Sequence, residues 1–393
     1  MTDIPKIHVK NRFQKRSTTY QDILTDSILV DITRRITGLT SFEVVFDEVG
    51  YNRGRLLTLE WQGRRSLVSL SETSIMGRNS AFQSIGTAVN RYLVNTSTDK
   101  ELCFYFLPDI AGNFQTAYFK FLYRLLATIG VKFLNPEFLS TIPAAFIDAR
   151  NIELARASLQ ALSRGNRSSY LTRGSGGQVQ IYGKTYGASK YETTLIAAAV
   201  ASIEKAEIEL YEVAEGGLTK LPRASLDALN ALGGIRVITA SRTFEESIFE
   251  AKEEIRSPKF IYNLLEHLGP KKCEVCECTV PEIIQGAHVW PISEIKSQIE
   301  LALDEKIAHA VHQANGLWLC ENHHKLFDRS IIVIDDSGKL GLSVQLDEDA
   351  KKYLESTTTV QRLSDTRLST EFLGYLKKRN DALATDFSKY QFA

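Results

Sequence analysis

Four residues near the C-terminus have the types and the spacing of a zinc site. Cys273 and Cys276 are separated by two residues, and so are Cys320 and His323. A tetrahedral zinc ion takes four thiolate or imidazole ligands, and a tight turn between two ligands brings both side chains onto one ion. The spacing therefore predicts a structural Zn²⁺ site formed by two such pairs.

Two alternatives to this ligand set stay open. Disulfides are disfavoured, because five cysteines is an odd number and the N-terminus does not resemble a secretory signal. Cys278 could replace Cys276 as a ligand, although the two-residue spacing favours Cys276. The fifth cysteine, Cys103, lies in the apolar run 102–107 and is expected to pack inside a strand.

Three further polar residues, His288, Asn315 and His324, are interleaved with the zinc pairs. Their order resembles the HNH endonuclease family, which is built on a ββα-metal fold. The resemblance covers about residues 265–335. It implies two strands and a short helix, at residues 280–290, 316–320 and 322–328. Residues 296–313 form a helical insert before Asn315 that either shapes access to the site or only packs.

The resemblance implies a catalytic role for each member of this trio. His288 corresponds to the general base, Asn315 to the residue that orients it and pins the loop, and His324 to a ligand of a catalytic Mg²⁺ or Mn²⁺. A neutral imidazole can take a proton from water, and the cation would neutralise charge on the leaving 3′ oxygen. His323 then belongs to zinc, because adjacent helix residues point about 100° apart. The opposite assignment of the two histidines stays open.

One position departs from the family pattern. Many members carry Asp immediately before the base histidine, where it ligates the catalytic ion, and this chain has Ala287. Asp328 lies one turn after His324, on the same helix face, and is the candidate second ligand. Asn315 could ligate instead through its side-chain oxygen. Alternatively, Asp328 only caps the helix or pairs with a neighbouring basic residue.

A basic stretch precedes this region. Residues 154–191 contain no acidic residue and interleave basic side chains with tyrosines and glycines. Basic groups together with aromatic rings suit phosphates and bases, so we expect nucleic-acid contact here. The residues expected to bind nucleic acid are Arg164, Arg167, Arg173, Lys184 and Lys190, and the stretch also contains Arg156, Tyr170, Tyr182, Tyr186 and Tyr191. A flexible interdomain linker is the alternative.

Composition restricts the class of protein. The chain has 393 residues, 44% hydrophobic and 24% charged, which is ordinary for a globular protein of several domains. Its formal net charge of zero argues against a wholly basic DNA-coating protein. The longest apolar run, 195–203, is too short to span a bilayer, so no membrane partner is expected. Without a leader and with a thiol-rich metal motif, the expected location is the cytoplasm.

The expected fold class is α+β and multidomain, with the ββα-metal nuclease core and its zinc site in the C-terminal part. We expect an α+β domain over 1–150, an α/β domain over 151–262, the nuclease with its zinc pairs over 263–345, and helices over 346–393. Residues 1–30 are predicted to be a polar arm that leads into a short helix. Periodicity predicts strands at 42–46, 56–60, 67–70, 102–107, 179–182, 208–213 and 235–239, a hairpin at 331–334 and 342–345, and helices at 82–93, 114–129, 191–204, 224–232, 244–268 and 347–384.

These features predict a metal-dependent HNH endonuclease that cleaves DNA, and its long N-terminal part suits recognition of the substrate. Without a nucleotide-binding loop it resembles a stand-alone restriction or phage-defence enzyme in organisation. The alternatives are a non-catalytic, zinc-stabilised DNA-binding protein and a homing or mobile-element nuclease. Double-strand cleavage by one such site usually needs two protomers or two nicks, so a homodimer is one expectation. The sequence gives only weak support for a second nuclease site, of the restriction-fold type, at Asp47 and Glu60, because the lysine that such a site requires is absent.

Overall fold

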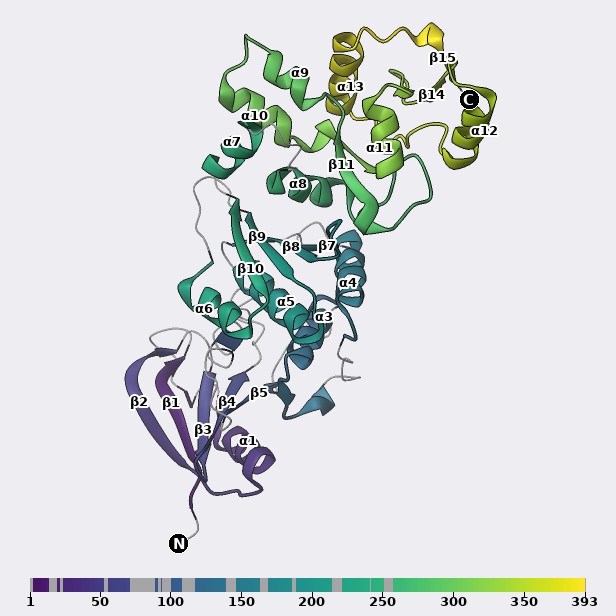
Figure 1. Ribbon diagram of the computed structural model, residues 1–393. Helices are drawn as coiled ribbons and strands as arrows, with labels where there is room; N and C mark the ends of the chain where they lie inside the picture. Colours follow the sequence, from purple (N-terminus) through teal and green to yellow (C-terminus); the bar gives the residue numbers. More distant parts are fainter. Residues whose placement is uncertain are drawn as a thin grey trace. The chain divides into compact units, whose positions relative to one another are not determined.

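The chain divides into two compact units, each containing helices and sheet (Figure 1). The first comprises residues 1–171 and 183–238, and the second comprises residues 172–182 and 239–393. The computed structural model describes residues 3–13, 20–21, 24–52, 56–70, 89–90, 93, 100–107, 117–138, 146–162, 169–185, 189–213, 221–240, 242–250 and 257–392. Within these ranges, no helix combines the length and apolar character needed to cross a membrane. The predicted α+β class is confirmed, and the division into four domains stays a prediction.

The first unit contains a six-stranded mixed sheet with the strand order β2-β1-β3-β4-β5-β6. Strand β1 runs parallel to β2 and antiparallel to β3, and β5 runs parallel to β4 and β6. The strands are β1 (Lys6–Phe13), β2 (Glu43–Asn52), β3 (Leu56–Trp61), β4 (Arg64–Leu70), β5 (Lys100–Tyr105) and β6 (Lys132–Phe133). Helix α1 (Asp26–Thr37) packs against this sheet through Ile28, Leu29 and Ile32. The four strands predicted between 42 and 107 are therefore confirmed.

Strand β1 contradicts the prediction of a polar arm over residues 1–30. Ile7 and Val9 are 0% and 1% exposed, and they alternate with polar residues along the strand. In a central strand, this alternation buries one face while the other face stays polar. His8 on the polar face contacts Glu60 of β3 at 3.2 Å. The segment Lys6–Phe13 is too polar to be recognised as a strand from its sequence. Its pairing with β2 and β3 determines its conformation.

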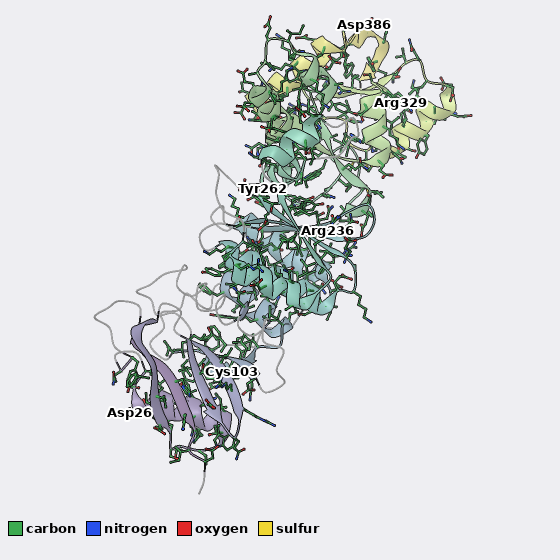
Figure 2. All side chains as sticks on the ribbon, turned by 60° about the vertical axis from the view of Figure 1, so that its left-hand side comes forward. Asp26, Cys103, Arg236, Tyr262, Arg329 and Asp386 are labelled. Carbon is green, nitrogen blue, oxygen red and sulfur yellow. The ribbon has the colours of Figure 1, made fainter. Side chains whose placement is uncertain are left out.

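Two smaller predictions concern the same sheet. Cys103 in β5 is fully buried within the core cluster, so its predicted packing inside a strand is confirmed (Figure 2). Burial also raises the pKa of its thiol. The second metal site considered at Asp47 and Glu60 gains no support. The carboxylate of Glu60 forms ion pairs with His8 and Arg65, and the side chain of Asp47 lies outside the described part of the chain.

A second sheet has four strands in the order β10-β9-β8-β7. Its strands are β7 (Ser169–Arg173), β8 (Val179–Lys184), β9 (Ile208–Val213) and β10 (Ile235–Ala240). The helices of the first unit whose bounds are described after α1 include α3 (Ala117–Thr128), η2 (Pro136–Phe138), α4 (Ala149–Leu162), α5 (Ser189–Ile203) and α6 (Arg223–Leu232). In α5 the residues from 195 to 200 are all buried, so the longest apolar run of the chain is an interior helix. The helix predicted at 82–93 falls mostly outside the described residues.

The structure corrects part of the interpretation of the basic stretch. Arg156 is 1% exposed and forms an ion pair with Glu192, whose carboxylate is 0% exposed, at 2.8 Å. Tyr118 and Ser169 also donate to this carboxylate, at 2.6 and 3.1 Å. Tyr170 and Tyr182 are buried in the strands. Arg156 and these two tyrosines are therefore core residues that cannot contact a nucleic acid.

This buried network leads to a prediction for stability. Replacing Glu192 with alanine leaves the Arg156 charge buried without its partner, which is expected to lower the free energy of unfolding by about 3–5 kcal/mol. Urea unfolding of the first unit measures the change. The matched control is Asp227→Ala, which breaks an exposed pair with Arg223 and is expected to cost less than about 1 kcal/mol. Equal effects of the two substitutions would contradict the prediction.

The longer segment of the second unit, residues 239–393, contains α7 (Arg242–Glu250) and α8 (Pro258–Leu268) as its first helices with described bounds. The prediction of one helix over 244–268 is corrected at Ser257, whose side chain accepts a hydrogen bond from Phe260 N and so caps a new helix. A two-stranded antiparallel ladder, β11 (Ile284–His288) with β12 (Gly316–Cys320), lies on α8. Gly286 and Gly316 permit this approach, because a Cβ on either would lie within 3.0 Å of α8 side chains.

The rest of the second unit surrounds this ladder. The helices between and after the two strands are η4 (Pro281–Ile283), α9 (Ile292–Ser297), α10 (Leu303–Val311), η5 (Gln313–Asn315) and α11 (Glu321–Asp328). They are followed by β13 (Ile332–Ile334), β14 (Leu340–Ser343), α12 (Glu348–Thr357), α13 (Thr370–Ala382), η6 (Phe387–Lys389) and β15 (Tyr390–Phe392). The two strands, the helix and the hairpin predicted for this region are confirmed. The helical prediction over 347–384 is wrong for residues 358–369, and the third strand β15 was not predicted.

Candidate active site and metal centre

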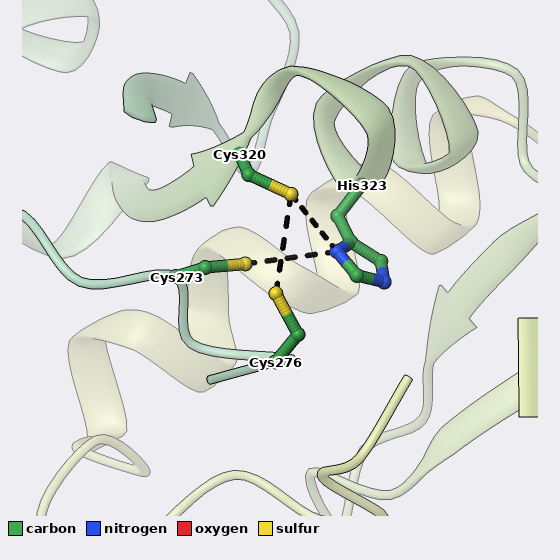
Figure 3. Close-up of side chains that lie close together, drawn as sticks. All are labelled: Cys273, Cys276, Cys320 and His323. Carbon is green, nitrogen blue, oxygen red and sulfur yellow. Dashed lines mark hydrogen bonds between the residues drawn. The ribbon is translucent and has the colours of Figure 1, made fainter. Parts of the chain in front are cut away.

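The four predicted zinc ligands meet in the second unit (Figure 3). Their ligand atoms all lie within 4.8 Å of one another. Cys320 Sγ lies 3.1 Å and Cys273 Sγ 3.7 Å from His323 Nδ1, and Cys276 Sγ lies 4.0 Å from Cys320 Sγ. With metal–sulfur bonds of about 2.3 Å, tetrahedral ligand atoms are separated by about 3.8 Å. The cluster therefore has the donors and the size to hold one metal ion.

The surroundings of the cluster suit a metal centre. Cys273 and Cys320 are buried, and desolvation by burial raises the pKa of both thiols, so a nearby cation is needed to favour thiolates. Burial lowers the pKa of His323, which favours the neutral ring that can ligate. His323 Nε2 lies 3.2 Å from Thr358 Oγ1, so with Nδ1 on a metal the Nε2–H would donate to this hydroxyl.

The alternative ligand Cys278 is not part of the cluster. Its backbone carbonyl instead accepts a hydrogen bond from Cys273 N at 2.9 Å, which closes the turn that brings Cys273 and Cys276 together. Glu274, between these cysteines, accepts from Arg367 at 2.6 Å, and Arg367 also donates to the Gly316 carbonyl. The first ligand pair is thereby fixed to the start of β12.

His288, the last residue of β11, lies in a defined orientation. Its ring stacks on Phe260 of α8, with centroids 3.9 Å apart and planes at 11°. Its Nε2 lies 2.8 Å from the carbonyl oxygen of Ala310, in the last turn of α10, where helix carbonyls lack intrahelical partners. A carbonyl can only accept, so the proton of the neutral ring is on Nε2 and the lone pair is on Nδ1. The helical insert that precedes Asn315 therefore supports this histidine directly.

Asn315 is completely buried and connects the same elements. Its Oδ1 accepts from Trp290 N at 2.7 Å, and its Nδ2 donates to the carbonyls of Trp290 at 3.3 Å and His309 at 3.1 Å. Val289 N donates to the Asn315 carbonyl. Because Oδ1 is committed to the backbone, the alternative in which Asn315 ligates the cation gains no support.

The hydrogen bonds of Asn315 predict that its substitution by aspartate lowers both stability and activity. Asn315→Asp keeps the acceptor but loses both side-chain donors, so the carbonyls of Trp290 and His309 each lose a hydrogen bond, at an expected cost of about 1–3 kcal/mol each. The end of β11 is expected to shift, and the DNA cleavage expected from the sequence to slow about 100-fold. Urea unfolding and single-turnover cleavage measure the two effects. The control is Gln313→Ala in the same short helix; an Asn315→Asp protein that cleaves as fast as this control would contradict the prediction.

His324 and Asp328 lie together on α11. His324 Nε2 is 3.4 Å from Asp328 Oδ2, and the side chains are 8% and 46% exposed. Asp328 makes no ion pair with Lys325 or Arg329, both of which the structure describes. An imidazole nitrogen and a carboxylate oxygen at this separation can serve either as an ion pair or as two ligands of one cation.

The residues expected to bind nucleic acid are not gathered at one described place. Arg173 is partly buried and lies 4.0 Å from Glu282 in the second unit. Lys190 lies over the ring of its neighbour Tyr191, and Lys184 is a partly buried residue of β8. Arg164 and Arg167 lie outside the described residues, as does Tyr186. Their contact with nucleic acid stays a prediction.

Three participants in the site were not predicted: Phe260, Thr358 and the Ala310 carbonyl. Phe260 belongs to the apolar face of α8, and nothing in its spacing distinguishes it from other core residues. A backbone carbonyl is common to every residue type and therefore has no sequence signature. The helical periodicity before Asn315 was the only available signal for the Ala310 contact.

Comparison with known proteins agrees with this geometry. A family model described as HNH endonuclease matches residues 273–335, which contain both ligand pairs, His288, Asn315 and the His324–Asp328 pair. A search of curated proteins gives no match to the chain. The matched segment coincides with the β11, β12 and α11 elements and their metal cluster. Residues 273–335 are therefore an HNH endonuclease domain.

Proposed function

We propose that the chain is a metal-dependent endonuclease that hydrolyses phosphodiester bonds of DNA, with His288 as its general base. The orientation of His288 is the observation that carries this proposal. The Ala310 carbonyl holds the proton on Nε2, and Phe260 supports the ring from one face. The basic nitrogen of the ring is therefore Nδ1, and this is the atom that we propose accepts the proton.

In the proposed reaction, His288 Nδ1 removes a proton from water as the water oxygen attacks phosphorus. The new P–O bond forms as the bond to the 3′ oxygen breaks, which leaves a 5′-phosphate and, after protonation, a 3′-hydroxyl. Asn315 positions the base by holding the backbone beyond β11 against the end of α10. His324 and Asp328 would hold Mg²⁺ or Mn²⁺, which when bound neutralises the charge of the leaving oxygen.

The second metal centre is proposed to be structural zinc. Three sulfurs and one imidazole nitrogen form a closed set of four ligands, which is typical of structural rather than catalytic zinc.

Ala287 cannot ligate the catalytic cation, and it is completely buried where it pairs with Leu317 of β12. Asp328 is the proposed replacement, because it contacts His324 on the same helix.

We further propose that the first unit selects the DNA and that the enzyme acts in restriction or phage defence in the cytoplasm, where zinc-binding thiols stay reduced. A ββα core alone has little surface with which to specify a long site. The first unit has its own sheet and core, so it can present a separate recognition surface. Arg164, Arg167, Lys184 and Lys190 are its proposed phosphate contacts, and Arg173, which belongs to the second unit, is a further proposed contact.

The test is cleavage of plasmid, phage and host DNA, each methylated and unmethylated, by the purified full chain with Mg²⁺, with Mn²⁺ and with EDTA. Metal-dependent cleavage supports the nuclease, and discrete fragments reveal a recognition site. The ratio of nicked to linear plasmid at increasing protein concentration reports whether a dimer is needed. DNA that is bound but never cut would instead favour the non-catalytic binding protein, and one cleaved site in host DNA would favour a mobile-element nuclease.

A further inference from the structure

Helix α13 lies outside the matched residues 273–335, yet its side chain Arg379 contacts the elements on both sides of the site. Its Nη1 donates to the carbonyl of Val289 at 3.3 Å, directly after His288. Its Nη2 donates to the carbonyl of Phe327 at 2.5 Å, directly before Asp328. The guanidinium also lies 3.8 Å from the centroid of the Phe327 ring. One side chain thus connects the end of β11 with the last turn of α11.

The environment of Arg379 is unusual for a charged group. The residue is 2% exposed, and among the residues that the structure describes no carboxylate pairs with it. Burial lowers its pKa to about 10, partly offset by Asp328, so it stays charged at neutral pH. Its charge faces the carbonyls that end α11, where the helix dipole is negative. Burying an unpaired charge costs several kcal/mol, and an apolar residue would fill the same space without that cost.

Two neighbours of Arg379 attach α13 to the same group of elements. Tyr375 Oη lies 2.8 Å from His309 Nδ1, next to Ala310, whose carbonyl holds His288. Asn380 donates to the carbonyl of Ile334 at 3.2 Å, in the strand that follows α11. Helix α13 therefore contacts α10, the end of β11 and the segment around α11, and the last two carry His288 and the His324–Asp328 pair.

We propose that Arg379 is a positioning residue for DNA cleavage, which fixes the separation between His288 and the His324–Asp328 pair. This inference rests on the proposed function. The base and the cation ligands must act on one phosphate from two different elements, and a displacement of about 1 Å can lower a rate about 100-fold. A planar guanidinium suits this task, because its two Nη groups address two carbonyls at once, whereas an ammonium is a single point of charge.

Two variants of Arg379 and one control test the proposal. Arg379→Met keeps the apolar length but removes all donors, and Lys377→Met removes a charge from an exposed position of the same helix. We expect Arg379→Met to lower the single-turnover rate at saturating DNA about 100-fold, with zinc content unchanged and KM within about threefold. Lys377→Met is expected to stay within about twofold of wild type in the same assay. Arg379→Ala is expected to regain activity in millimolar guanidinium but not in equimolar urea.

The outcomes separate this inference from the proposed function. A wild-type cleavage rate in Arg379→Met would overturn the inference. It would also be overturned if Arg379→Met and Arg379→Ala were both inactive, had both lost zinc and were not rescued by guanidinium, because that result indicates a purely structural role. If the wild-type chain cleaves no DNA, the proposed function fails, and Mn²⁺ binding followed by electron paramagnetic resonance still tests the geometry. About tenfold weaker Mn²⁺ binding by Arg379→Met supports the positioning role, and equal binding overturns it.

Discussion

Replacing His288 with glutamine is expected to lower the rate of DNA cleavage by about 10²- to 10⁴-fold, the usual contribution of a general base. The glutamine amide can still donate to the Ala310 carbonyl and fill the space beside Phe260. It cannot accept a proton from water at neutral pH. The substitution therefore removes basicity while it preserves packing, and single-turnover cleavage of plasmid measures the loss.

Two controls make this result specific to the base. Zinc content and the melting temperature of the His288→Gln protein are expected to match those of wild type, because neither the Cys273, Cys276, Cys320 and His323 cluster nor the core is altered. His267→Gln, outside the trio, is expected to cleave normally. If His288→Gln retains more than about a tenth of the wild-type rate, another group is the base.

Replacing Cys320 with serine is expected to abolish metal binding and to unfold the second unit, while the first unit stays folded. Structural zinc contributes about 10–16 kcal/mol of apparent binding free energy in small zinc modules, which is as large as the whole stability of a typical domain. Cys320 begins the turn from β12 into α11, so without the metal the ladder and the helix lose their common anchor. Metal analysis and hydrogen exchange of the two units measure the effects.

The cysteine that lies outside the cluster provides the matched control. Cys278→Ser changes the same atoms two residues from Cys276, but its sulfur is not part of the ligand set, so zinc content and exchange protection are expected to be unchanged. Cys103→Ser is a second control within the first unit, where it tests only core packing. Zinc retained by Cys320→Ser, or lost by Cys278→Ser, would contradict the assigned ligands.

The parts of the fold that were predictable were those with strong local signals. Ligand pairs two residues apart, an apolar run between them and a following polar helix defined β12 and α11 nearly to the residue. The hairpin of β13 and β14 was likewise marked by its polar turn. By contrast, β1 is largely polar and β15 has only three residues, so both are strands because of the neighbours with which they pair.

In the basic stretch, residues 154–191, the sequence likewise could not show which charged side chains are buried. Arg156 and Arg173 both lie within this run, which lacks acidic residues, so nothing in the sequence distinguishes them. The fold brings Glu192, from beyond that run, against Arg156 and buries the pair, while Arg173 stays partly exposed. Composition reports how many charges are present, but only the packing decides which of them face solvent.

The sequence by itself determined which residues form the cluster of three cysteines and one histidine and which trio is proposed to be catalytic, because ligand chemistry depends on side-chain type and short spacing. Only the tertiary structure decided how His288 is oriented and that Arg379 joins β11 to α11. Those contacts run to backbone carbonyls of Ala310, Val289 and Phe327, which every residue type possesses. They also link segments far apart in the chain, so their geometry exists only once the core has formed.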